Sequence, residues 1–190
     1  MNEPKQEIWL MRHGETEWSA EGKHTSRTDL PLLPSGIEQA HELSARLTGQ
    51  QFALVLVSPM QRARETCQIA GYGDVAQVTL DLHEWDYGEY EGRSTAEIRR
   101  DRPDWSLWRD GVPCGETVEQ VGARVQRVID RCVQAQGNVA LFAHGHVLRI
   151  LTAVWLELPP KDGQFFALNT GTIGALGYEH DYRVIRQWNC

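Results

Sequence analysis

The residues best suited to covalent chemistry follow a short apolar run near the start of the chain. Ile8 to Met11 is apolar, and Arg12, His13 and Gly14 come directly after it. We predict a strand with these three residues at its carboxyl end, where ligands bind in open α/β sheets. An unprotonated histidine ring can attack phosphorus, and a neighbouring arginine can hold phosphate oxygens with its planar charged fork. Gly14 has no Cβ, so we expect a sharp turn there and a close approach of phosphate. The pattern indicates phosphoryl transfer.

Two later segments also end an apolar run with polar residues. Residues 52–57 form a continuous apolar run, and Arg62 falls early in the helix predicted after it, where the helix dipole favours an anion. Residues 139–143 form a second such run, and His144 follows it. The strand–His–Gly–helix order at His144 repeats the order at His13, which favours a functional histidine over a buried structural one.

Cleavage of a phosphate ester also needs an acid, because an alkoxide is a poor leaving group. Several acidic side chains lie from Glu84 to Glu91, and their spacing alone does not select one. A carboxyl group kept protonated by partial burial or by a nearby phosphate can serve. After giving up its proton, the same group can activate water.

Four segments in this order resemble the signature of the histidine phosphatase superfamily, the phosphoglycerate-mutase-like proteins. They are Arg12–Thr16, Ser58–Thr66, Leu82–Gly92 and Leu141–Arg149. The resemblance implies a phosphohistidine intermediate and assigns three roles. The nucleophile is His13, the proton donor is Glu84, and the phosphoryl group is held by Arg12, Arg62 and His144.

The resemblance continues outside these segments and is closest to the sedoheptulose-bisphosphatase-like branch. It implies that the substrate is bound by Ser19, Thr25, Ser26, Tyr87 and Gly145. We expect Glu91 to support a loop, and His146 to be structural or part of the pocket wall.

Predicted strands alternate with helices, which favours an α/β fold. We predict a single domain over residues 1–190, built as a three-layer α/β/α sandwich with a mostly parallel sheet and helices on both faces. An irregular insertion at about 83–115 is expected to cover the site. The expected boundaries include helices capped by Ser35 and Thr117, a helix that starts at Ser58-Pro59, and strands at 75–80, 165–168, 174–178 and 183–188.

Composition limits the partners. The chain has 190 residues and a net charge of −7, from 19 basic and 26 acidic residues, so we expect neither general nucleic-acid binding nor membrane binding. No apolar run reaches membrane-spanning length, and the N-terminus MNEPKQE does not predict a signal peptide. The four cysteines show no metal-finger spacing, and we expect reduced thiols in a cytoplasmic protein.

We predict hydrolysis of a small phosphate ester, a sugar phosphate or bisphosphate, without metal or cofactor, since two arginines repel a cation. Arg99 and Arg100 offer charge for a second phosphate. Two alternatives remain open, a phosphoglycerate mutase and a catalytically silent protein that binds phosphorylated ligands. The sequence predicts no oligomeric state.

Overall fold

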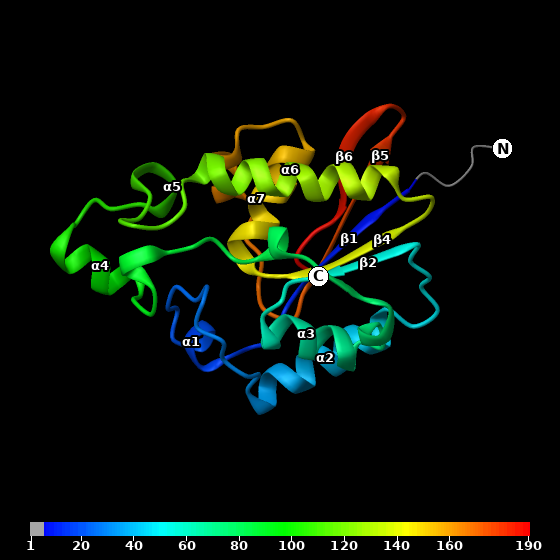
Figure 1. The fold of residues 1–190 in the computed structure, drawn as a ribbon, viewed down its shortest axis with the longest axis horizontal. Helices are drawn as coiled ribbons and strands as arrows, with labels where there is room; N and C mark the ends of the chain where they lie inside the picture. The colour runs from blue at the N-terminus through cyan, green and yellow to red at the C-terminus, as the bar shows by residue number, and fades with distance from the viewer. Residues whose placement is uncertain (1–5) are drawn as a thin grey trace.

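A six-stranded sheet organises the computed structural model, which describes residues 6–190 (Figure 1). The strand order is β3-β2-β4-β1-β5-β6. Strands β3, β2, β4 and β1 run parallel, while β5 is antiparallel to β1 and β6 is antiparallel to β5. The predicted mostly parallel α/β sheet is confirmed. The strands are β1 (Ile8–Arg12), β2 (Leu54–Val57), β3 (Gln77–Val78), β4 (Val139–Ala143), β5 (Ile173–Glu179) and β6 (Tyr182–Gln187).

Helices cover both faces of the sheet, as predicted. Figure 1 shows α6 (Val118–Gln134) and α7 (Gly145–Trp155) over one face, and α2 (Pro34–Arg46) and α3 (Gln61–Ile69) over the other. Successive strand residues point to opposite faces. Leu141 therefore joins the core under α6 and α7, and Phe142 joins the core under α2 and α3.

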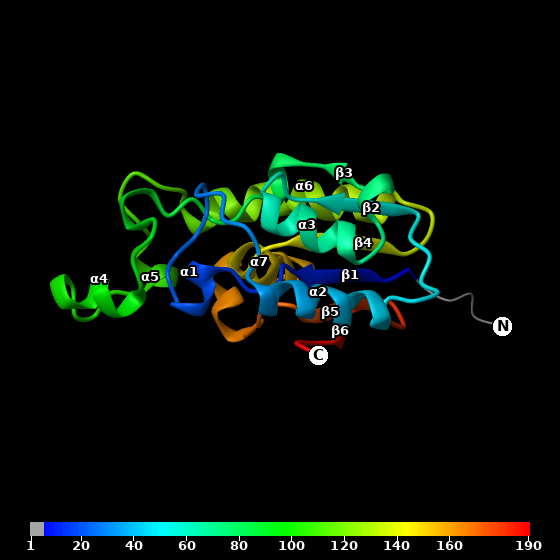
Figure 2. The ribbon, with the colours of Figure 1, turned by 90° about the horizontal axis from the view of Figure 1, so that it is seen from below.

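Shorter helices lie mainly beyond the carboxyl end of the parallel strands. Figures 1 and 2 show α1, α4 and α5 on that side of the molecule. Their bounds are α1 Glu17–Ala20, α4 Thr95–Asp101 and α5 Leu107–Asp110, and 3-10 turns cover η1 Gly73–Val75, η2 Leu80–Leu82, η3 Gly88–Tyr90 and η4 Pro160–Phe165.

The register of the parallel strands brings the signature segments to one edge. Arg12 pairs with Ala143 across β1 and β4. The backbone N–H of His13 donates to the carbonyl of Ala143 at 3.0 Å, and the N–H of Ser58 donates to the carbonyl of Phe142 at 3.0 Å. The residues that follow β1, β2 and β4 therefore lie side by side at the carboxyl edge of the sheet.

Two predicted helix starts are wrong. Ser35 does not cap α2, because Pro34, which has no N–H to satisfy, begins the helix one residue earlier. The hydroxyl of Ser35 instead donates to Oε2 of Glu15 at 2.7 Å. Helix α3 begins at Gln61 rather than at Ser58-Pro59, with Met60 in extended conformation before it. The capping box at Thr117 is confirmed.

The insertion is more regular than predicted. Ser94 and Glu97 form a capping box that starts α4, a signal that the sequence contained, and α5 follows. Trp85 and Trp105 are buried in the main core.

Two strand predictions also need correction. The segment 165–168 is not a strand, because β5 already pairs with the edge of β1 and Phe165 ends a 3-10 turn. The strand expected at 75–80 shortens to β3, since 3-10 turns flank it on both sides.

All four cysteines are free, and Cys67 and Cys132 are buried. Within residues 6–190 we find no helix of the length and apolarity needed to cross a bilayer. The absence of a signal peptide was predicted from the N-terminus MNEPKQE. Residues 1–5 of this segment lie outside the described part of the chain.

Candidate active site

A cavity of about 250 Å³ lies at the carboxyl edge of the parallel strands. Most of the predicted site residues line it. They are Arg12, His13, Ser19, Thr25, Glu84, Tyr87 and Gly145. Arg62, His144 and Ser26 are not among the lining residues and lie behind the wall.

His13 is buried, and its ring is held in one tautomer. A carbonyl oxygen can only accept, so Nδ1–H of His13 donates to the Gly14 carbonyl, 2.7 Å away. The pKa of His13 lies well below its ordinary value, first because of burial and then because of the charges of Arg62 and Arg12. The ring is therefore neutral near pH 7, and Nε2 carries the lone pair.

Arg12 keeps one donor without a partner among residues 6–190. Its Nη1 donates to the Leu168 carbonyl at 2.6 Å, while its buried Nε has no hydrogen-bond partner in this part of the chain. A Cβ on Gly145 would lie 3.3 Å from Cζ of Arg12, so the glycine makes room for the guanidinium group. Burial also lowers the pKa of Arg12. An anion in the cavity would satisfy the charge and the free N–H.

Gly14 is also required for packing, a reason that the sequence did not predict. A Cβ there would lie 2.2 Å from the carbonyl oxygen of Gly36, at the start of α2. The backbone N–H of Gly14 donates to Oγ1 of Thr66 on α3 at 3.1 Å. Close packing of the turn against α2 is therefore one reason for the glycine, and the expected approach of phosphate stays a prediction.

His144 lies against His13, with ring centroids 5.1 Å apart. Its Nδ1 accepts a bond from Nε of Arg62 at 3.2 Å, so the neutral ring carries its proton on Nε2. That nitrogen lies 2.7 Å from the hydroxyl of Ser58 and donates to it. Burial, followed by the charge of Arg62, holds the pKa of His144 well below its ordinary value. Both ring nitrogens are engaged by protein groups.

Arg62 is fully buried, and protein groups take up most of its donors. Besides His144, it donates to the carbonyl oxygens of Thr25, Ser26 and Thr28. Its charge still acts on the site, because it is the largest electrostatic contribution that lowers the pKa of His13. Arg62 therefore orders the loop and supplies positive potential from behind the wall.

The carboxylate of Glu84 sits at the N-terminus of α7. Its two oxygens accept from the backbone N–H groups of Trp85, His146 and Val147, each at 2.9 Å. Free N–H groups at a helix start attract negative charge. These bonds direct the carboxylate of Glu84 toward the start of α7, and the residue also lines the cavity.

Two other predicted substrate residues have protein partners. The hydroxyl of Ser19 bonds to the backbone of Thr16 and completes the cap of α1, although Ser19 lines the cavity. Ser26 is buried, and its Oγ donates to the carbonyl of Glu84 at 3.1 Å. Glu91 supports the loop, as predicted, by accepting the N–H of Ser26.

Several lining residues were missed or left open by the sequence. The wall also contains Gly22, Lys23, His24, Thr95, His146, Arg149 and Leu168. Arg149 follows His146 by three residues on a helix, and this spacing could have placed both on one face. Tyr87 Oη lies 2.6 Å from Nδ1 of His146. Nothing in the sequence marked His24, whose pKa burial lowers to about 4.

A larger cavity, of about 750 Å³, lies between α5, the start of α6 and η4. None of the predicted site residues lines it, so its size does not make it the reactive site. Arg99 and Arg100, expected to offer charge for a second phosphate, line neither cavity. The cations that line the smaller cavity are Arg12, Lys23 and Arg149.

Comparison with known proteins agrees with this geometry. Residues 8–190 match the family model of the histidine phosphatase superfamily (branch 1). The chain is 39% identical to an acid phosphatase of Mycobacterium tuberculosis, over 94% of this chain and 89% of that protein. It is 36% identical to sedoheptulose 1,7-bisphosphatase of Saccharomyces cerevisiae, over 78% and 67% of the two chains. The solved structure of the open reading frame Rv3214 from Mycobacterium tuberculosis superimposes with a TM-score of 0.93, at 36% identity and 98% coverage of both chains.

Proposed function

The chain belongs to the histidine phosphatase superfamily and is a phosphatase, and from that premise we propose that it hydrolyses a small phosphate monoester through phosphohistidine at His13. One observation carries this proposal. His13 lines the cavity as a neutral ring with Nδ1 held by Gly14, so the lone pair on Nε2 is free to attack.

We assign the phosphoryl group to the side of the cavity where Arg12 and His13 meet. Arg12 offers its unpaired Nε–H, and Arg62 supplies charge from behind the wall. Positive charge placed in advance stabilises negative charge on the transferring oxygens. We keep His144 as the third phosphoryl partner. In that role its ring must exchange its bond with Ser58 for one with the phosphate.

Glu84 is the proposed acid and then the proposed base. In the first step Nε2 of His13 bonds to phosphorus, the ester P–O bond breaks, and the carboxyl proton of Glu84 passes to the leaving alkoxide. In the second step the Glu84 carboxylate takes a proton from water, the water oxygen bonds to phosphorus, and the P–N bond breaks. Inorganic phosphate, the alcohol and the original enzyme result.

A sugar phosphate or bisphosphate is the proposed substrate. The yeast relative is named for a sugar bisphosphate. The cavity lining supports a polar, anionic leaving group, because besides Arg12 and His13 it presents Lys23, Arg149 and Tyr87. A volume of about 250 Å³ suits a small molecule. Ser19, Thr25, Tyr87 and Gly145 are proposed to contact it, and Ser26 to act through the loop.

We propose that the reaction needs neither metal nor cofactor, since the charges that face His13 are guanidinium groups. The net charge of −7 supports a small-molecule substrate over nucleic acid or a membrane surface. We propose a cytoplasmic location for the protein.

A panel of sugar phosphates, sugar bisphosphates and phosphoglycerates, assayed with chelator present, tests the proposal. We expect release of inorganic phosphate and the free alcohol. Isomer formation from phosphoglycerate without phosphate release would instead identify a mutase. Loss of activity with chelator would contradict the metal-free mechanism.

A further inference from the structure

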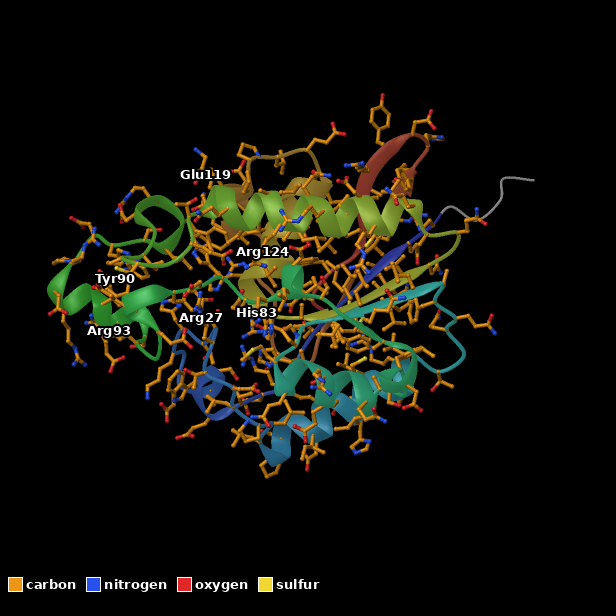
Figure 3. All side chains as sticks on the ribbon, in the orientation of Figure 1. Arg27, His83, Tyr90, Arg93, Glu119 and Arg124 are labelled. Carbon is orange, nitrogen blue, oxygen red and sulfur yellow. The ribbon has the colours of Figure 1, made fainter. Side chains whose placement is uncertain are left out.

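A buried arginine on α6 forms hydrogen bonds with the backbone of the segment that ends at Glu84. Arg124 is 7% exposed. Its Nη1 donates to the carbonyl oxygens of Asp81 and His83 at 2.8 and 2.7 Å, and its Nη2 donates to the carbonyl of Glu84 at 3.1 Å. Figure 3 labels Arg124 on α6 beside His83. Three carbonyl groups that precede or belong to the proposed acid are bound by one side chain.

Glu116 completes this arrangement from the other side. Its carboxylate accepts from Nε and Nη2 of Arg124 at 2.8 and 2.9 Å. Together with the three carbonyl bonds, these contacts use all five N–H donors of the guanidinium group. The same carboxylate accepts the N–H of Asp86 at 2.9 Å, and the backbone carbonyl of Glu116 accepts the indole N–H of Trp85 at 2.8 Å. The residues after Glu84 are therefore fixed as firmly as those before it.

Glu84 is held from two directions. Arg124 fixes its backbone from α6, and Glu116, just before that helix, holds Arg124. The start of α7 fixes its carboxylate through the N–H groups of His146 and Val147. The position of the carboxylate relative to Nε2 of His13 depends on both. A shift of about 1 Å in a reacting group can cost about a hundredfold in rate.

We propose that Arg124, paired with Glu116, is a positioning residue for proton transfer by Glu84. This inference rests on the proposed role of Glu84 as acid. Arg124 touches neither the cavity nor the substrate, because it is absent from the lining residues. It acts by keeping the Glu84 backbone in place while the carboxyl group gives up and regains its proton.

The dependence on leaving group separates positioning from general stability. An alkyl ester such as glycerol phosphate needs a proton on its departing oxygen, whereas 2,4-dinitrophenyl phosphate releases a stable phenolate without one. Damage to the proton donor alone therefore slows the first substrate and spares the second. Damage to the whole site slows both.

The test compares kcat/KM on these two substrates for Arg124→Met, Arg124→Lys and Glu116→Gln. For Arg124→Met and Glu116→Gln we expect a loss of about 10- to 100-fold on glycerol phosphate and a change within about twofold on the dinitrophenyl ester. Arg124→Lys should recover part of the loss, since an ammonium group can reach some of the carbonyl groups. The control is Arg131→Met on the same helix, whose half-buried side chain donates from Nη2 to Oε1 of Gln77 at 3.1 Å. It should change neither rate.

Glu84→Gln and the Glu84→Gln/Arg124→Met double variant complete the design. If Arg124 acts through Glu84, the double variant should lose no more than Glu84→Gln alone, because coupled groups are not additive. Equal losses on both substrates, or additive losses, would overturn the inference. If Glu84→Gln slows both substrates equally, the proposed acid fails first, and the inference fails with it. Should Arg124→Met not fold, Glu116→Gln, which keeps the side-chain volume, decides alone.

Discussion

The ring of His13 donates a hydrogen bond to the carbonyl oxygen of Gly14, and the two atoms are 2.7 Å apart. The bond lies within the turn that follows β1, so the residue that ends the apolar run fixes its own tautomer. A backbone carbonyl cannot titrate, and the bond persists at every pH at which the turn is folded. The nucleophile is thus prepared by local structure, while its low proton affinity comes from burial and from Arg62 and Arg12.

Replacement of His13 should abolish turnover and leave the fold intact. For His13→Ala we expect a loss of at least about 10⁴-fold in kcat, because no other group in the cavity replaces the nucleophile. The thermal unfolding midpoint should remain close to that of the wild type. His41→Ala, an exposed histidine on α2, is the matched control and should keep full activity. Residual activity of His13→Ala above about 1% of wild type would contradict the assignment.

Magnetic resonance of the histidine rings should show the predicted tautomer directly. Burial and two nearby guanidinium groups lower the pKa of His13 well below its ordinary value. Its ring should therefore stay neutral, with the proton on Nδ1, at pH values at which an ordinary histidine ring is already protonated. Nitrogen-15 shifts measured across this range test the prediction. A titration of His13 with a midpoint near 6.5, or a proton on Nε2, would count against it.

Acid should destabilise the fold through its buried histidines. The pKa of His24 falls to about 4, and those of His13, His144 and His146 lie well below the ordinary value. Below pH 6.5 the unfolded chain therefore binds more protons than the folded one, so the free energy of unfolding falls as pH falls. His24 alone accounts for about 3 kcal/mol between pH 7 and pH 4.

The contribution of His24 can be isolated with His24→Gln. Denaturant unfolding of both proteins at several pH values should show a steeper loss of stability in the wild type, by about one proton between pH 6 and pH 4. Parallel curves for the two proteins would mean that His24 titrates in the folded state as it does in the unfolded state.

Gly36→Ala should lower stability, because Gly36 packs against the turn that follows His13. A Cβ at Gly36 would lie 2.2 Å from the backbone carbonyl oxygen of Glu15, which cannot move independently of the signature turn. We expect a loss of about 1–3 kcal/mol in the free energy of unfolding. Gly49→Ala, where the added carbon has no neighbour within 4 Å, isolates the backbone effect of its positive φ. A cost at Gly36 no larger than that at Gly49 would contradict the packing argument.

The sequence allowed prediction of the site residues that come directly after a strand. His13, Arg12 and Glu84 lie in one cavity because their segments follow or flank parallel strands. The hydrophobic pattern marked three of the parallel strands, β1, β2 and β4. Burial on both faces made β4 a continuous apolar run that was easy to recognise. The fold class followed from the same runs.

The sequence could not show how each polar side chain is satisfied. Arg62 was expected to hold phosphate, yet its donors go largely to loop carbonyl groups. His144 was expected to donate into the site, yet Arg62 and Ser58 engage both of its nitrogens. These partners come from separate segments, so only the packed structure brings them together. The role of Arg124 could not be predicted for the same reason, since three of its five bonds reach Asp81, His83 and Glu84, at least 40 residues away.

Trapping the covalent intermediate tests the central claim most directly. Wild-type enzyme is mixed rapidly with a ³²P-labelled sugar phosphate and quenched with alkali, which preserves phosphohistidine, and the labelled peptide is then identified. We predict one labelled site, on His13, that is lost on acid treatment and is absent from His13→Ala. Normal turnover with no labelled peptide, or with the label on another residue, would contradict the account.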